Sequence, residues 1–241
     1  MLQRTPGIVL RQIRYSDTSL VVKVYTADYG LIGLMARGVR SAKGRSKAAL
    51  LQPPNILDLV LYYKEGRELH HFRELRPAFV YTRIPFEITR STTAIFLTEV
   101  LGKCLKEQHP DPDIFQFLQR ALVVLDTTDQ GLGIFPHYFL FRLSQLMGFQ
   151  PGHHPGGEAW FDLREGIYTT RHPGHPENLA PVEAELLAAM ESMRFESLAT
   201  PKEMRGSRHK LLQGLLDYFR LHVEGFGELR SPDILTEVLR G

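Results

Sequence analysis

Apolar and polar residues alternate along the first third of the chain, which is the period-2 pattern typical of β-strands. Leu20, Val22 and Val24, for example, occupy alternate positions within one such stretch. Short segments such as Asp28-Tyr29-Gly30 interrupt the alternation and supply turns. The pattern predicts five short strands, at residues 7–15, 19–27, 31–38, 56–63 and 68–75.

The connections between these strands indicate how the sheet closes. The longest connection falls between the third and fourth strands. Five short strands with such a connection fit a small closed or nearly closed barrel of the OB-fold type. We therefore predict a first domain over residues 1–80.

After Pro77 the apolar residues recur at helical spacing instead. The spacing, together with Pro and Gly breaks, predicts helices at residues 84–105, 114–125, 135–147, 182–193, 207–223 and 231–239. An insertion at residues 148–181 is rich in Gly, Pro and His, and we expect a small β-hairpin within it, packed through Trp160, Phe161, Ile167 and Tyr168. The expected fold class is α+β: a five-stranded OB-fold barrel, then an all-helical domain over residues 81–241 with a β-hairpin insertion.

The composition of the 241-residue chain is that of an ordinary globular protein, with 43% hydrophobic and 23% charged residues. No apolar run approaches the roughly 18 residues of a membrane span, and we expect a cytoplasmic protein without membrane contact. Cys104 is the single cysteine and lies in an apolar helical pattern. Internal disulfides and cysteine-based zinc sites are therefore excluded.

Charge is distributed unevenly along the chain. Residues 1–80 hold 13 Lys plus Arg against 6 Asp plus Glu, whereas residues 81–241 hold 16 against 21. Within the first part, residues 36–47 carry five cations and no acid, separated by small residues that let the backbone bend close to a ligand. This excess predicts that the first domain contacts a polyanion.

Short segments in this order and spacing resemble one known family. They are Gly7-Ile8-Val9-Leu10-Arg11, Tyr15 followed by Asp17, Thr26 with Tyr29-Gly30, Ala36-Arg37-Gly38-Val39-Arg40, Leu51-Gln52-Pro53, Ser207-Arg208 through Leu211-Leu212, Tyr218-Phe219, His222, and Leu229-Arg230-Ser231. Together they span nearly the whole chain and resemble RecO, the bacterial recombination mediator of DNA repair.

The resemblance implies a non-enzymatic DNA-binding protein of recombinational repair. RecO-like proteins bind single- and double-stranded DNA through the OB-fold and anneal complementary strands. They work with RecR to help RecA replace single-strand-binding protein, so RecA is an indirect partner. They also bind the acidic, hydrophobic C-terminal tail of single-strand-binding protein through the helical domain.

The cations of the first domain are the expected DNA-binding residues. Each can neutralise a phosphate, and tyrosines of an OB-fold can offer stacking faces beside them. The predicted cations are Arg37, Arg40, Lys43, Arg45 and Lys47, extended by Arg11 and Lys23, with Tyr25, Tyr29 and Tyr62 as candidate stacking residues. Two alternatives stay open: a mobile solvated connection whose charges only confer solubility, and RNA as the ligand of an RNA-binding or ribosome-associated protein.

Two arginines of the helical domain are candidates for docking an acidic protein tail. Arg142 lies on an otherwise apolar helix, and Arg208 lies at the start of the last long helix. An arginine beside an apolar groove can pair with a terminal carboxylate. The alternative is that both are ordinary surface cations.

We predict no catalytic residue, metal or cofactor. The chain has no phosphate-binding GxxxxGK[ST] motif and no recognisable nucleophile motif. Many RecO-like proteins carry a four-cysteine zinc site in the region of the insertion, whereas this chain has His153, His154, His172 and His175 there. Adjacent histidines rarely point at one ion, so we interpret these as loop residues; a metal-dependent hydrolase built on them is the remaining alternative.

Overall fold

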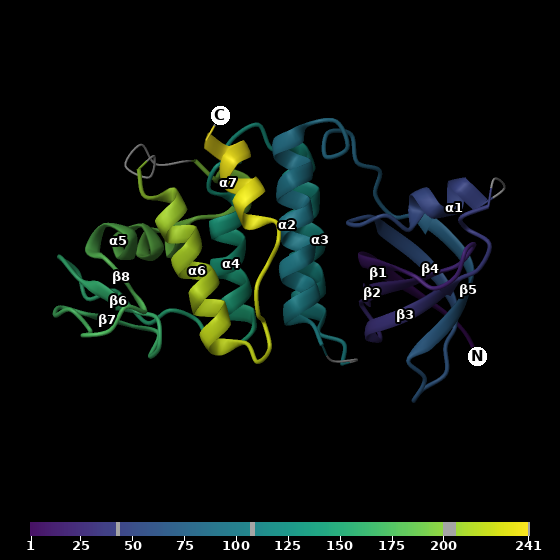
Figure 1. Cartoon of the computed structure of the whole chain (residues 1–241), viewed down its shortest axis with the longest axis horizontal. Coiled ribbons are helices and arrows are strands. Elements are labelled where there is room, and N and C mark those ends of the chain that lie inside the picture. Colours follow the sequence, from purple (N-terminus) through teal and green to yellow (C-terminus); the bar gives the residue numbers. More distant parts are fainter. Residues whose placement is uncertain (42–43, 107–108, 200–205, 241) are drawn as a thin grey trace. The chain divides into compact units, whose positions relative to one another are not determined.

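The computed structural model describes residues 1–241 except 42–43, 107–108, 200–205 and 241 (Figure 1). Its contacts divide the chain into two compact units. The first comprises residues 1–87 and 94–126, and the second comprises residues 88–93 and 127–241. A domain boundary near residue 80 stays a prediction.

The first unit contains a closed five-stranded barrel with the order β1-β2-β3-β5-β4. The strands are β1 (Leu2–Arg14), β2 (Leu20–Thr26), β3 (Gly30–Ala36), β4 (Ile56–Tyr62) and β5 (Leu69–Pro77). All five predicted strands are present and contribute apolar side chains to one core. β1 begins at Leu2, ahead of the predicted residue 7, and register shifts between Val9 and Arg11 and between Val60 and Leu61 interrupt the strict alternation. The OB-fold expected from the sequence is confirmed.

Closure of the barrel depends on one parallel pairing, between β3 and β5, whereas the other strand pairs are antiparallel. If cross-strand partners are followed around the barrel from Leu2 of β1, the path passes through β4, β5, β3 and β2 and returns to β1 at Ile13. The path is therefore displaced along β1 between its start and its end. Such a displacement requires strands strongly tilted to the barrel axis. At the β3–β5 contact a Cβ on Gly33 would lie 2.7 Å from the Glu68 carbonyl oxygen, so only glycine permits this approach.

A short helix, α1 (Arg45–Leu50), lies across one end of the barrel, where Ala48 and Leu50 pack against the core (Figure 1). The Asn55 side-chain amide donates to the Ala49 and Leu50 carbonyl oxygens (2.9 and 3.0 Å) and satisfies the end of the helix. The sequence pattern did not predict this helix. Part of residues 36–47, which we call the basic segment, is therefore helical, where we expected a bending connection.

Two longer helices follow the barrel, α2 (Ile88–Cys104) and α3 (Pro112–Thr127). Within the first unit, Asp126 near the end of α3 accepts four hydrogen bonds of 2.8–3.0 Å, from the backbone N–H groups of Thr82, Arg83 and Ile84 and from the Thr82 hydroxyl. Burial alone would raise the pKa of Asp126, but these donors hold it below its usual range. The segment leaving the barrel is thus tied to α3.

The second unit is mainly helical. Its helices are α4 (Phe135–Leu146), α5 (Pro181–Ala189), α6 (Arg208–His222) and α7 (Pro232–Arg240), with short 3-10 turns at Met190–Ser192 and Phe195–Ser197. Proline stands in the first turn of α4, α5 and α7, where its missing N–H costs nothing. The predicted helices are confirmed, with ends shifted by a few residues. Among the described residues, no helix has the length and apolarity that crossing a membrane would need.

The insertion holds a three-stranded sheet, ordered β7-β6-β8, in place of a two-stranded hairpin. β6 (Trp160–Asp162) pairs with β7 (Ile167–Thr169) as expected, and β8 (Asn178–Leu179) adds a third strand. Phe161 is fully buried and contacts the rings of Tyr168 and Tyr218. Ile167, which we expected to pack, is 49% exposed because its side of β7 faces solvent.

Candidate nucleic-acid interface

The basic segment is fixed to the barrel at the turn between β1 and β2. Val39 is 1% exposed and belongs to the barrel core. The Arg40 backbone N–H donates to the Thr18 carbonyl oxygen (3.2 Å), and its guanidinium Nη1 donates to the Ser16 carbonyl oxygen (3.3 Å). These contacts argue against a freely mobile connection.

Two glycines shape the segment between β3 and α1. Gly38 has φ +69°, in the left-handed region that glycine adopts without strain. The Ser41 hydroxyl donates to the Gly38 carbonyl oxygen (2.6 Å). A Cβ on Gly44 would lie 2.5 Å from the Val39 Cα. Gly44 therefore lies directly against Val39, an approach that leaves no room for a side chain at this position.

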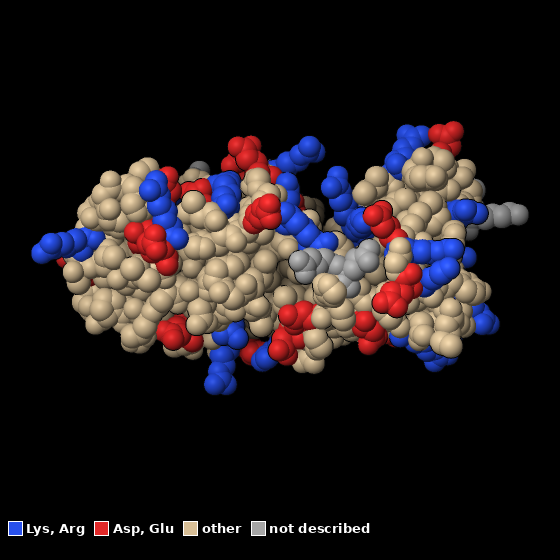
Figure 2. All heavy atoms as spheres, turned by 90° about the horizontal axis from the view of Figure 1, so that it is seen from below, with Lys and Arg blue, Asp and Glu red and all other residues tan. Residues whose placement is uncertain are grey.

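Four of the five predicted cations of this segment lie among the described residues, and all four are exposed. Arg37 and Arg40 flank the buried Val39, whereas Arg45 and Lys47 lie on α1. Lys43 lies outside the described residues. Figure 2 shows Lys and Arg side chains projecting from the barrel, with Asp and Glu side chains among them.

Arg11 and Lys23, the two predicted cations outside the segment, are direct cross-strand partners on β1 and β2. Arg11 is exposed and Lys23 is half-buried. Both lie on the outer face of the sheet, since the neighbouring Val22 and Val24 point into the core. The barrel thus brings these two predicted residues together.

The predicted tyrosines differ in what they can offer. Tyr25 is wrong as a stacking residue: it is 2% exposed and packs against Phe115 of α3, with ring centroids 6.3 Å apart. Tyr29 is stacked on Tyr63 (3.9 Å), which leaves it partly covered. Tyr62 is 56% exposed on β4. Tyr25 lies on the outer face of β2, as the alternation of side chains along the strand requires, but α3, which is distant in sequence, covers that part of the face.

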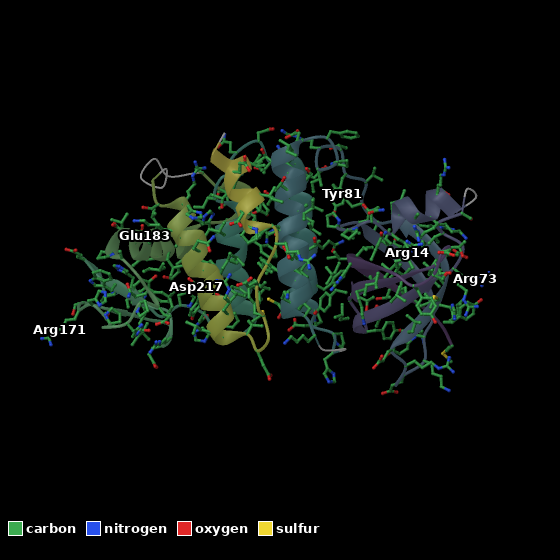
Figure 3. The ribbon with its side chains drawn as sticks, in the orientation of Figure 1. Arg14, Arg73, Tyr81, Arg171, Glu183 and Asp217 are labelled. Atoms are coloured by element: carbon green, nitrogen blue, oxygen red, sulfur yellow. The ribbon has the colours of Figure 1, made fainter. Side chains whose placement is uncertain are left out.

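Two residues that were not among the predicted DNA-binding residues stand beside the basic segment. Arg14 ends β1, and its guanidinium lies 3.0 Å from Asp17 in an exposed ion pair (Figure 3). Tyr15 follows it and is 67% exposed. The signal was present in the sequence, because Arg11, Ile13 and Tyr15 have the period-2 spacing of one strand face.

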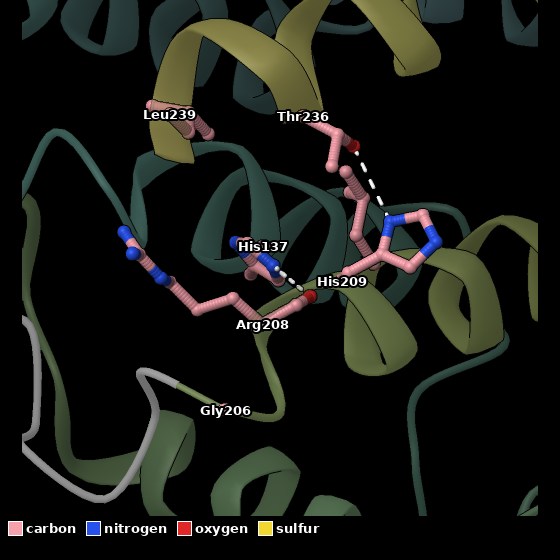
Figure 4. A pocket seen from close by; sticks show the side chains of 7 residues that line it. His137, Gly206, Arg208, His209, Thr236 and Leu239 are labelled. Atoms are coloured by element: carbon pink, nitrogen blue, oxygen red, sulfur yellow. Dashed lines mark hydrogen bonds between the residues drawn. The ribbon is translucent and has the colours of Figure 1, made fainter. Parts of the chain in front are cut away.

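In the second unit Arg208 lines a pocket, whereas Arg142 contacts a residue that lines another one. Arg208 lines a pocket of about 120 Å³ between α4, α6 and α7, together with Leu212 and Leu239 (Figure 4). Arg142 instead donates to the Gln145 side chain (2.6 Å), and Gln145 lines a separate, more polar pocket of about 260 Å³.

The Arg208 pocket is organised by a buried histidine. His137 of α4 is 1% exposed, and its Nε2 lies 2.8 Å from the Arg208 carbonyl oxygen. Because that oxygen can only accept, Nε2 carries the proton. Burial lowers the pKa of His137 to about 4, so the ring is neutral at pH 7. This hydrogen bond ties α4 to the first residue of α6.

The insertion histidines contact different neighbours. His154 packs against Tyr168, and His172 packs against Trp160. His175 lies between two carboxylates, with its Nε2 3.1 Å from Asp162 and its Nδ1 3.4 Å from Glu177. Across the described ranges, no three His, Cys, Asp or Glu side chains converge in a way that could hold a metal ion. Cys104 is buried, which raises the pKa of its thiol to about 12.

Known proteins match this chain along nearly its whole length. The family model described as "Recombination protein O N terminal" matches residues 1–81, and the model described as "Recombination protein O C terminal" matches residues 85–232. A protein of Phocaeicola vulgatus named DNA repair protein RecO is 30% identical over 239 residues, 99% of each chain. Proteins of the same name from Bacteroides fragilis and Flavobacterium johnsoniae are 31% and 30% identical, over 99% and 98% of each chain. With both family models matched in order and relatives aligned end to end, the chain belongs to the RecO family.

Proposed function

We propose that this protein is a DNA-binding recombination mediator. It binds single- and double-stranded DNA, anneals complementary strands, and, with RecR, helps RecA load onto DNA coated with single-strand-binding protein. Membership of a family whose relatives are named DNA repair proteins supports the repair role. The observation that carries DNA binding is the basic segment, which is fixed on an OB-fold barrel with its described cations exposed.

The proposed mechanism is electrostatic and needs no covalent chemistry. Two DNA strands repel each other, and a surface that neutralises phosphates on both lowers the cost of bringing complements together. Arg11 and Lys23 on the sheet face and the basic segment beside the β1–β2 turn supply this charge. The protein is therefore proposed to be non-enzymatic and to anneal DNA without nucleotide or metal.

The test is fluorescence-monitored annealing of complementary strands coated with the cognate single-strand-binding protein. The Arg37→Ala, Arg40→Ala and Lys43→Ala triple variant is expected to lose most of the annealing rate. With five phosphate contacts, single-strand binding by the wild type should show a log-log salt slope of roughly −3.5, and the triple variant should lose roughly 2 units of that slope.

A second triple variant, Arg4→Ala, Arg73→Ala and Arg76→Ala, is the matched control. It removes the same charge from exposed residues of the same barrel, on β1 and β5. Annealing by this variant should stay close to wild type. An equal loss in both variants would show that overall charge, and not the basic segment, governs binding, and a wild type that does not anneal would overturn the proposed function.

For the tail of single-strand-binding protein we propose the Arg208 pocket. Its volume of about 120 Å³ approaches that of a cavity known to admit one benzene ring, roughly 150 Å³. Leu212 and Leu239 supply apolar lining, and the guanidinium of Arg208 can pair with a terminal carboxylate. The pocket thus offers both features that an acidic tail with a hydrophobic end requires.

Fluorescence anisotropy with the labelled C-terminal tail peptide tests this pocket. Arg208→Ala is expected to weaken peptide binding by at least about tenfold, because a charge-assisted hydrogen bond is lost. Arg220→Ala, on the same helix and paired with Asp217, should change little. If Arg142→Ala weakens binding and Arg208→Ala does not, the tail binds at the other pocket.

A further inference from the structure

Tyr15 is an aromatic residue of the barrel whose ring is exposed and has no evident structural role. It is 67% exposed, at the point where β1 meets the turn to β2. Within the described part of the chain, its side chain has no hydrogen bond and its ring contacts no other ring. Tyr25, Tyr29 and Tyr63, by contrast, all pack against other rings.

The backbone determines which way Tyr15 faces. Its N–H donates to the Ser19 carbonyl oxygen (3.1 Å), which continues the β1–β2 register that pairs Ile13 with Val21 and Arg14 with Leu20. Because side chains alternate along a strand, Tyr15 lies on the same outer face as Ile13. Ile13 is itself 40% exposed.

The outer face of β1 thus presents a column of three exposed side chains: a cation at Arg11, an apolar residue at Ile13 and an aromatic ring at Tyr15. Cations stand at both ends of this column. Lys23 is paired with Arg11 at one end, and at the other end Arg40 is hydrogen-bonded to Ser16, the residue after Tyr15.

This arrangement has the chemistry of a single-stranded nucleic-acid site. Cations follow the phosphates, and an exposed ring gives an unpaired base a surface on which to stack. A duplex hides its base faces within its own stack, so the same ring gains nothing from intact double-stranded DNA. An exposed tyrosine flanked by phosphate-binding groups therefore favours single strands over duplexes.

We propose that Tyr15 is the stacking platform for one unpaired base and makes this protein bind single-stranded DNA more tightly than duplex DNA. The proposal rests on the proposed function, because it assumes that the surface around the β1–β2 turn binds DNA. It adds a residue and a source of discrimination that charge alone cannot supply, since phosphates look alike in single and double strands.

The test measures dissociation constants of wild type, Tyr15→Ala and Tyr15→Phe for three probes of equal length: oligothymidylate, an oligonucleotide of abasic sites, and a blunt duplex. Tyr15→Ala is expected to weaken oligothymidylate binding about 5- to 100-fold. Binding of the abasic strand and of the duplex should change less than twofold, and the salt slope should stay at the wild-type value. Tyr15→Phe should bind all three like wild type, because the ring and not the hydroxyl is used.

Phe86→Ala is the control for loss of an exposed ring. Phe86 is 82% exposed, belongs to the first unit and lies after β5, outside the barrel strands. Its removal should leave oligothymidylate binding unchanged.

Three outcomes overturn the inference. Unchanged oligothymidylate binding by Tyr15→Ala refutes the stacking role while the proposed function stands. An equal loss on all three probes would mean that the substitution disturbs the site as a whole. A wild type that binds none of the probes would remove the proposed function and this inference together.

Discussion

At the scale of single residues, tertiary contacts decide what Arg40 and Tyr25 can offer a ligand. The excess of cations identified Arg37 and Arg40, but nothing in the pattern indicated that Arg40 binds the β1–β2 turn. Tyr25 was predicted as a stacking residue, yet Phe115 of a helix distant in sequence covers it. Contacts of this kind depend on tertiary packing, which local periodicity does not contain.

His137 should make stability depend on pH. Its folded-state pKa of about 4 lies below the ordinary value of 6.5, so between these values the unfolded chain binds a proton that the folded chain does not. The stabilising contribution is fully present above about pH 6.5 and is lost as the pH falls toward 4, up to about 3 kcal/mol. Urea unfolding at pH 7 and pH 5 should therefore show a loss of up to about 2 kcal/mol from this residue.

His137→Gln keeps an N–H donor near the Arg208 carbonyl oxygen and does not titrate. Between pH 7 and pH 5, the unfolding free energy of this variant should fall by up to about 2 kcal/mol less than that of wild type. His209→Gln, which alters an exposed histidine lining the same pocket, is the control and should follow wild type. If His137→Gln and wild type lost equal unfolding free energy between pH 7 and pH 5, the lowered pKa of His137 would be contradicted.

At the scale of elements, alternation and helical spacing were sufficient for every strand and helix long enough to show a period. The elements that escaped are α1, with six residues, and β8, with two. Neither is long enough for a pattern to repeat, and both are held by contacts with other parts of the fold. The parallel pairing of β3 with β5 escaped for a different reason: it joins strands that are not consecutive in sequence.

Gly33 at that pairing and Gly102 in α2 should respond in opposite ways to substitution by alanine. Gly33→Ala places a Cβ 2.7 Å from the Glu68 carbonyl oxygen and should destabilise the fold by about 1–3 kcal/mol. Gly102→Ala lies in α2 with no atom within 4 Å of the new Cβ, so the lower chain entropy of alanine should stabilise by about 0.5–1 kcal/mol. Urea unfolding midpoints measure both changes. A raised midpoint for Gly33→Ala would contradict the close approach at Gly33, and a lowered midpoint for Gly102→Ala would contradict the open space at Gly102.

At the scale of the whole molecule, the sequence predicted a basic first part and an acidic remainder, and the structure gives each its own candidate surface. The exposed cations of the OB-fold belong to the first unit, and the Arg208 pocket belongs to the second. The two units are not continuous segments of the chain, because α2 contributes residues to both, and α3 of the first unit is tied to the segment that leaves the barrel. A pattern read along the chain cannot show such sharing, since it follows sequence and not contacts.

Closure of the barrel limits how any protein partner can bind it. Each of the five strands has two neighbours, and along most of the barrel wall a partner has no edge to which it could add a strand of its own. The β3–β5 pairing is the exception, because it covers only residues 33–35 of β3 and 69–71 of β5. Elsewhere on the barrel a partner must bind through side chains, and its affinity will then respond to single surface substitutions. The edge strands β7 and β8 of the other sheet, with three and two residues, give little room for β-augmentation.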